Sequence, residues 1–141
     1  MIIVDTGFWL ALFNSRDHWH PRAKAFMSQL EEPLITTLPV ITETAYLLSQ
    51  RSGLDNAIEF IEDAHRGQFD VFDIGQGNFG RMAILMRQYA DLPMDLADAS
   101  LVVLAEQLGH GRILSTDQRD FQAYRWKRHH PFVNLLSDTN P

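Results

Sequence analysis

The chain has 141 residues, of which 45% are hydrophobic and 21% charged, and its formal net charge is −6. These values are typical of a soluble globular protein long enough to bury a core, and they predict a single domain over residues 1–141. The absence of cysteine excludes disulfides and thiolate metal sites and fits a reducing cytoplasm, while no apolar stretch approaches the ~20 residues of a membrane span.

Short apolar runs alternate with helical patterns along the first half of the chain. Residues 2–4 and 34–37 are β-like runs, and we expect each to form a short strand. Asp5 and Thr6 follow the first of these runs, and both residue types cap helices well. Capping residues and helical spacing predict four helices: residues 8–13, one that begins at Pro21, one between Pro39 and Gly53, and residues 55–66. In the last of these helices we expect Ile58, Ile61 and Ala64 to face the core.

The second half of the chain continues the same alternation. Apolar and acidic residues alternate over residues 69–74, which predicts a half-exposed strand. Two helices are expected next, then two strands, over residues 77–90, 95–108, 112–115 and 132–136. The order of these elements predicts an α/β sandwich around a mainly parallel sheet. Two successive helices between the third and fourth strands would return the chain to the sheet edge that it left, so one of them must lie obliquely or one boundary is wrong.

Four acidic residues lie beside predicted element boundaries. Asp5 and Asp117 each follow a β-like run, and ligand sites of open α/β sheets form at such strand ends. Glu43 and Asp98 lie on predicted helices. Each acid has a simpler explanation when taken alone, because Asp5 and Asp117 are good helix or turn caps and Glu43 has many polar neighbours.

Asp98 is the hardest of the four to explain as a surface residue. On a helix, Asp98 shares one face with the apolar residues Leu101, Val102, Ala105 and Leu108, so its carboxylate lies on the core-facing side. A buried carboxylate without a partner is costly. Asp95 lies three residues earlier on the same face, and such a pair repels unless a cation lies between the two carboxylates. Asp95 is therefore a fifth candidate ligand.

Grouped carboxylates require a counter-charge. Two of them ~4 Å apart repel by about 4 kcal/mol at an effective dielectric constant of ~20. A set of oxygen ligands without cysteine or a clear histidine pattern favours a hard ion, Mg²⁺ or Mn²⁺. One or two such ions can activate water and stabilise the leaving oxygen of a phosphodiester.

The net charge argues at first against a nucleic-acid partner, because proteins that bind phosphates are usually basic. Discounting four ligand acids changes the charge from −6 to −2. Residues 112–128 contain two acids and five basic residues, so the segment has a local charge of +3. It is either a solvated face or a surface that steers RNA. Its basic residues are Arg112, Arg119, Arg125, Lys127 and Arg128.

At these residues the chain resembles the PIN-domain ribonucleases, in particular the small VapC-like toxins of prokaryotic toxin–antitoxin pairs. The resemblance runs from Ile2 to about Leu136. Its pieces are Val4-Asp5-Thr6, Thr42-Glu43, Leu96-Ala97-Asp98-Ala99, and Leu114-Ser115-Thr116-Asp117 followed by Asp120-Phe121. Gly7 departs from the serine often seen in the family at that position.

The resemblance implies a three-layer α/β/α fold and metal-dependent cleavage of RNA. It maps the metal-binding and catalytic acids to Asp5, Glu43, Asp98 and Asp117, with Asp95 as a further metal ligand and Mg²⁺ or Mn²⁺ as the ion. It also implies a cytoplasmic homodimer and a cognate antitoxin that blocks the pocket. The alternative is a catalytically inactive PIN module that acts through protein contacts. A phosphoaspartate receiver or a haloacid-type phosphatase fits less well, because Thr6 and Gly7 follow Asp5 where those families place a second acid.

Overall fold

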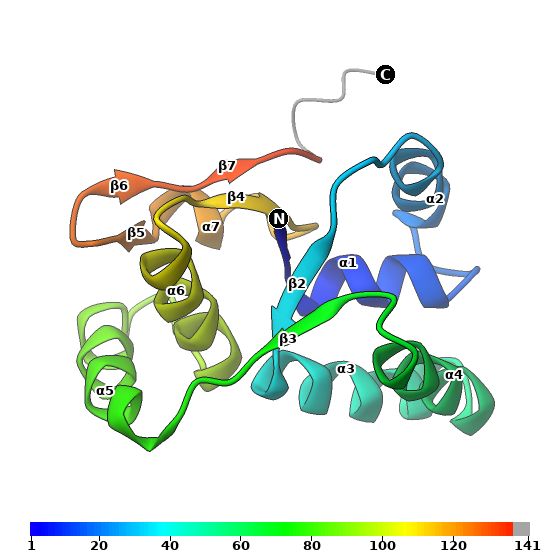
Figure 1. Cartoon of the computed structure of the whole chain (residues 1–141), viewed down its shortest axis with the longest axis horizontal. Coiled ribbons are helices and arrows are strands. Elements are labelled where there is room, and N and C mark those ends of the chain that lie inside the picture. Colours follow the sequence, from blue (N-terminus) through cyan, green and yellow to red (C-terminus); the bar gives the residue numbers. More distant parts are fainter. Residues whose placement is uncertain (137–141) are drawn as a thin grey trace.

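A central five-stranded sheet organises the computed structural model, which describes residues 1–136 (Figure 1). All four strand pairings are parallel, and the strands lie in the order β3-β2-β1-β4-β7. The strands are β1 (Ile2–Val4), β2 (Leu34–Thr37), β3 (Asp70–Phe72), β4 (Arg112–Leu114) and β7 (Val133–Asn134). Residues 137–141, part of the predicted domain, lie outside the described residues.

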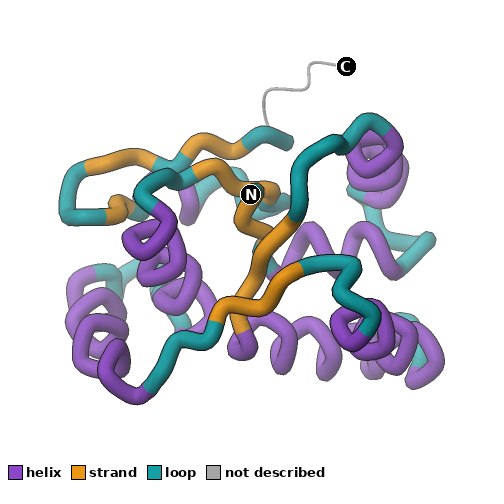
Figure 2. Tube along the Cα trace, in the orientation of Figure 1, coloured by secondary structure: helices purple, strands orange, loops and turns teal. Residues whose placement is uncertain are grey.

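Helices cover both faces of this sheet, as Figures 1 and 2 show. One layer contains α1 (Thr6–Phe13), α2 (His20–Ser28), α3 (Leu38–Arg51) and α4 (Leu54–His65), and the other contains α5 (Phe79–Gln88) and α6 (Leu96–Leu108). The predicted α/β/α architecture with a mainly parallel sheet is therefore confirmed. None of the helices within residues 1–136 has the length and apolar content needed to cross a bilayer.

The strand order explains how the chain uses two helices between β3 and β4. β4 pairs with β1 and not with β3, so the chain must cross from the edge strand to the far side of β1. The buried helix α6 contacts β1 and β2, and α5 packs on α6. No parallel strand has to begin at the edge that the chain left. The direction of strand order changes at β1, and the crevice at the carboxyl ends of β1 and β4 is where such sheets bind ligands.

An aromatic cluster anchors α4 to the rest of the core. The ring of Phe60 lies 5.4 Å from that of Trp9 and 5.5 Å from that of Phe69, and its side chain is fully buried. Ile58 and Ile61 are 45% and 44% exposed. The prediction that Ile58 and Ile61 face the core was therefore wrong, because Phe60 and not the isoleucines sets which side of the helix packs, whereas Ala64 is half-buried against the core as predicted.

Three short elements near the C-terminus were not predicted. The first is a one-turn helix, α7 (Asp120–Ala123). The others are β5 (Arg125–Trp126) and β6 (His130–Pro131), which pair as an antiparallel hairpin outside the main sheet. The helix expected over residues 77–90 begins later than expected, because residues Gln76–Asn78 form a 3₁₀ turn before α5. The helix α7 lies close to the carboxyl end of β4 and contributes to the site described next. The hairpin lies near the amino end of β4, where Trp126 closely approaches Gly111.

Candidate active site

Asp5 lies at the carboxyl end of β1 and is only 6% exposed. Its Oδ1 accepts a hydrogen bond from the backbone N–H of Phe8 at 3.0 Å, so the carboxylate caps α1. Its Oδ2 accepts a short hydrogen bond from the hydroxyl of Ser115, the first residue after β4. One oxygen of Asp5 thus caps α1, and the other is bonded to the residue that follows β4. The carboxylate also lines the central crevice.

Asp98 lies in the first turn of α6, which follows the cap residue Asp95. The backbone N–H of Asp98 donates to Oδ1 of Asp95 at 2.9 Å. The hydroxyl of the buried Tyr124, which directly follows α7, donates to Oδ2 of Asp98 at 3.1 Å. The two acids are therefore held by one helix N-terminus, and a residue 26 positions away fixes the orientation of Asp98.

Asp117 lies in the loop after β4 and Glu43 lies on α3, and both side chains reach the same crevice. Oδ1 of Asp117 accepts from the backbone N–H groups of Asp120 and Arg119, at 2.9 and 3.2 Å, which begins α7. The backbone N–H of Asp117 donates to Oγ of Ser115 at 2.9 Å. Glu43 lies in the second turn of α3 and is hydrogen-bonded to Thr6. Asp5, Glu43, Asp98 and Asp117 therefore reach the crevice from four different elements, and Asp95 shares the N-terminus of α6 with Asp98.

One cavity of about 350 Å³ brings these acids together, and all five predicted site residues line it. Two further lining residues, Asp120 and Arg51, were not among the predicted site residues. Asp120 follows Asp117 by three residues at the start of a helix, a spacing that could have identified it. Ser115 and Tyr124 were also missed as carboxylate partners, since only the fold brings them to Asp5 and Asp98.

Burial and mutual repulsion make these carboxylates hard to ionise together. Burial raises the pKa of Asp5 to about 7, and the charges of Asp117 and Glu43 add to this shift. Burial, followed by the charge of Asp95, raises the pKa of Asp98 to about 8. The pKa values of Glu43 and Asp117 are also raised, with burial as the main cause in both cases. Among residues 1–136 the fold thus gathers six acids around this cavity, with Arg51 as the one basic residue that lines it.

The cluster fits a hard divalent cation in its chemistry, although its side chains are spread apart. Its ligand atoms are carboxylate oxygens, the type that Mg²⁺ and Mn²⁺ prefer. Among residues 1–136, no three histidine or acidic side chains lie close enough together to hold a metal ion. Ser115 and Tyr124 each hold one of the acids by a hydrogen bond, at Asp5 and Asp98.

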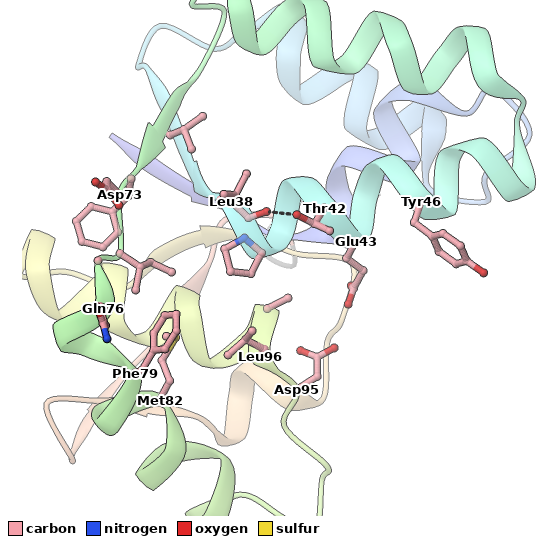
Figure 3. A pocket seen from close by; sticks show the side chains of 16 residues that line it. Leu38, Thr42, Glu43, Tyr46, Asp73, Gln76, Phe79, Met82, Asp95 and Leu96 are labelled. Carbon is pink, nitrogen blue, oxygen red and sulfur yellow. Dashed lines mark hydrogen bonds between the residues drawn. The ribbon is translucent and has the colours of Figure 1, made fainter.

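A larger and mostly apolar groove adjoins the acidic cavity (Figure 3). Its volume is about 1130 Å³, and it lies between α3, β3 and the starts of α5 and α6. Figure 3 shows Glu43 and Asp95 at one end of the groove, and both residues also line the acidic cavity. The exposed side chains of Leu38, Tyr46 and Phe79 line the rest. The groove is thus continuous with the acidic site.

The structure divides the basic segment at residues 112–128 into separate parts. Arg112 forms a two-armed salt bridge with Glu32, at 2.7 and 2.6 Å, near the amino ends of the strands. Arg119 pairs with Asp120 at 3.3 Å, beside the acidic cavity. The remaining three basic residues belong to the β5–β6 hairpin and the turn that joins its strands. These bases therefore do not form one continuous surface.

The departure at Gly7 has a steric explanation. A Cβ atom built at Gly7 would collide with Oγ1 of Thr116 and would lie 3.6 Å from Oδ1 of Asp5. A serine at position 7 therefore cannot coexist with this placement of Thr116. The pair of Gly7 and Thr116 keeps the end of β1 close to the end of β4.

Comparisons with known proteins agree with this fold. A family model described as PIN domain matches residues 2–127. Ribonuclease VapC26 of Mycobacterium tuberculosis is 27% identical over 124 residues, which cover 88% of this chain and 92% of that protein. The 23S rRNA-specific endonuclease VapC20 of the same organism is 42% identical over 53 residues, 38% of this chain and 40% of that protein. The crystal structure of VapC20, described as a sarcin-ricin loop cleaving toxin, aligns with a TM-score of 0.82 and 23% identity, covering 93% of this chain and all of that one.

Proposed function

We propose that this chain, which belongs to the PIN-domain family, is a metal-dependent endoribonuclease and the toxin of a toxin–antitoxin pair. The observation that carries the proposal is the convergence of acids from four elements on one cavity at the carboxyl ends of β1 and β4. The relative named Ribonuclease VapC26, which matches over nearly the whole of both chains, supports the same activity. An inactive binding module would have no need to maintain buried or half-buried, mutually repelling carboxylates.

The residues that would hold Mg²⁺ or Mn²⁺ are Asp5, Glu43, Asp98 and Asp117, with Asp95 beside them. When bound, the ion supplies a positive charge beside the reacting phosphate and makes water a stronger nucleophile. This proposal fits the raised pKa values of Asp5 and Asp98, because a central cation favours the ionised form of both.

The chain's own residues orient the acids and attract the substrate. Ser115 and the backbone N–H of Phe8 donate to the two oxygens of Asp5, and Tyr124 donates to Oδ2 of Asp98, so the orientation of each carboxylate is fixed. Arg51 lines the cavity, and Arg119 lies at its rim through Asp120. These two arginines are placed to attract the RNA backbone to the crevice.

Cleavage of RNA tests the proposed function. Purified protein is incubated with a mixed single-stranded RNA pool and a structured ribosomal RNA fragment, each with Mn²⁺, Mg²⁺ or EDTA. We expect cleavage that requires a metal and that Asp98→Asn abolishes. Glu59→Gln is the matched control, because Glu59 is an exposed acid on α4, away from the cavity. Persistent cleavage by the Asp98→Asn variant would remove the acidic cavity from the mechanism.

We also propose a homodimer and a cognate antitoxin as partners. Exposed apolar side chains are one support, since soluble proteins seldom leave large apolar patches uncovered. Such side chains line the groove at Leu38 and Phe79 and form a stripe on α4 at Leu54, Ile58 and Ile61. Sedimentation equilibrium at twice the 16.2 kDa chain mass would support the dimer, and a monomer at every concentration would exclude it.

A further inference from the structure

The β5–β6 hairpin carries an unusual concentration of positive charge for this chain. From Phe121 to Leu136 the sequence contains Arg125, Lys127 and Arg128 and no aspartate or glutamate, within a protein of net charge −6. The turn that joins the two strands consists of residues 127–129. Both Lys127 and Arg128 are exposed at its tip.

The backbone of this turn is unfavourable for the residues that occupy it. Lys127 has φ 46° and Arg128 has φ 73°, and they are the only residues other than glycine with positive φ in the described part of the chain. Glycine and asparagine adopt such angles at much lower cost, and hairpin turns that require two of them favour Asn-Gly. The geometry of the turn therefore does not explain why lysine and arginine occupy it.

The hydrogen bonds and ring contacts that hold the turn in place do not use these two side chains, and the charge of Lys127 contributes only to the lowered pKa of Glu106. The backbone N–H of Lys127 donates to Oε2 of Glu106 on α6 at 2.6 Å. Below the turn, the rings of Trp126 and His130 stack with centroids 4.4 Å apart, and Nε1 of Trp126 donates to the carbonyl of Pro131 at 3.0 Å. An asparagine at position 127 would keep the bond to Glu106, since any residue except proline supplies that N–H.

The two tip side chains are also available for a ligand. Arg112 and Arg119 are paired with acids, and the guanidinium of Arg125 donates to the carbonyls of Gln122 and Tyr124. Lys127 and Arg128 form no side-chain hydrogen bond or ion pair with residues 1–136. Residues kept at a backbone cost that the fold does not require are candidates for function.

We propose that Lys127 and Arg128 form a second RNA-binding surface that holds backbone phosphates remote from the site of cleavage. The inference rests on the proposed function, because it assumes that RNA is the substrate. Glu106, which anchors the turn, lies eight residues after Asp98 on α6, so a helical rise of ~12 Å separates it from that acid of the cavity. Only an RNA that extends beyond the cavity can reach both.

The test compares Lys127→Asn/Arg128→Gly with Arg16→Gln/Lys24→Gln, a control that removes two exposed positive charges elsewhere. Fluorescence anisotropy measures binding of a long and a short oligoribonucleotide in EDTA, where no metal-dependent cleavage occurs. We expect the hairpin variant to bind the long RNA about tenfold more weakly, or ~1.4 kcal/mol, and the short RNA as wild type does. Its slope of log affinity against log salt should fall by about 1.4, since two phosphate contacts are lost. Its Tm should rise by roughly 2–6 °C, because asparagine and glycine relieve the backbone strain at the two turn residues with positive φ.

The outcomes separate this inference from the proposed function. A hairpin variant that gains stability but binds long RNA with wild-type affinity and salt slope would overturn the inference, even if the enzyme cleaves RNA; an acidic protein would then be the better partner for the tip. A wild type that binds long RNA through the hairpin but never cleaves it would overturn the proposed function and leave the inference standing. A wild type that binds neither RNA would overturn both.

Discussion

Asp98 combines three influences that rarely meet at one carboxylate: burial, a neighbouring acid at Asp95, and a single hydroxyl donor, Tyr124. Its raised folded-state pKa means that the folded protein binds protons more tightly than the unfolded chain does. Stability from Asp98 and Asp5 is then fully present below about pH 4, the range of an unfolded aspartate, and is lost as the pH rises through about 7 and 8.

The metal-free protein should therefore lose stability between about pH 4 and pH 8. We expect Asp98→Asn to flatten this profile and to raise the Tm by several degrees at pH 8, because the variant removes a buried charge. Thermal denaturation in EDTA across this pH range measures the effect, with Glu59→Gln as the control for loss of one exposed acid. Equal pH profiles for wild type and Asp98→Asn would contradict the assigned pKa.

Tyr124 is predicted to position Asp98. Tyr124→Phe removes only the hydroxyl that donates to Asp98, so the packed ring remains and the fold should be retained. We expect kcat and Mn²⁺ affinity each to fall by about tenfold, consistent with ~1.5 kcal/mol for a hydrogen bond to a charged group. Tyr46→Phe is the control, because Tyr46 is 63% exposed and lines only the apolar groove. Unchanged Mn²⁺ binding by Tyr124→Phe in calorimetry would remove this role.

At the residue scale the acids were predictable, and their partners were not. Asp5 and Asp117 follow β-like runs in the sequence, and the carboxyl ends of adjacent parallel strands necessarily meet. Ser115 and Tyr124 carry no such signal, because serine after a strand and tyrosine after a helix are common. Their roles depend on the distance from β4 to β1 and from α7 to α6, which only tertiary packing sets.

At the scale of elements, α4 shows how an aromatic residue can override hydrophobic periodicity. Phe60 is fully buried between Trp9 and Phe69, whereas Ile61 is 44% exposed. Phe60→Ala should lower the free energy of unfolding by about 3–5 kcal/mol, because it leaves a cavity in the core. Ile61→Ala should cost well under 1 kcal/mol. Urea denaturation of both variants measures the difference, and equal losses would mean that the helix face is misassigned.

Long elements were predicted and short ones were missed for a physical reason. The pattern at residues 95–108 has enough turns to define a buried helix, and α6 begins within one residue of that prediction. The short β5–β6 hairpin has too few residues to show a period. It is fixed by tertiary contacts, such as the bond from Lys127 to Glu106. Local sequence patterns also cannot predict that β4 pairs with β1, because the paired residues lie more than 100 positions apart in the sequence.

At the scale of the whole molecule, a toxin should restrain the cell that produces it. Induced expression of the wild type in a bacterial host is expected to slow growth, and Asp98→Asn should relieve the effect at equal protein levels. Immunoblotting controls for expression, and Glu59→Gln should remain inhibitory. Growth inhibition that persists in the Asp98→Asn variant would assign the effect to something other than RNA cleavage.

The distribution of charge over the whole molecule explains how an acidic chain would bind an RNA substrate. The net charge of −6 is concentrated in part in one crevice, where a cation would reverse its local effect. Two exposed bases, Lys127 and Arg128, lie together at the hairpin tip, so the surface proposed to meet a long RNA differs from the average of the chain.

Calorimetric titration of Mn²⁺ into the metal-free protein tests most directly whether the acids form one cation site. We predict saturable binding that is lost in both Asp5→Asn and Asp98→Asn, two variants from different elements, and kept in Glu59→Gln. The pH of the titration should be about 8, where the wild-type acids are most easily ionised. Binding that survives both substitutions, or RNA cleavage without any Mn²⁺ or Mg²⁺ binding, would contradict the account.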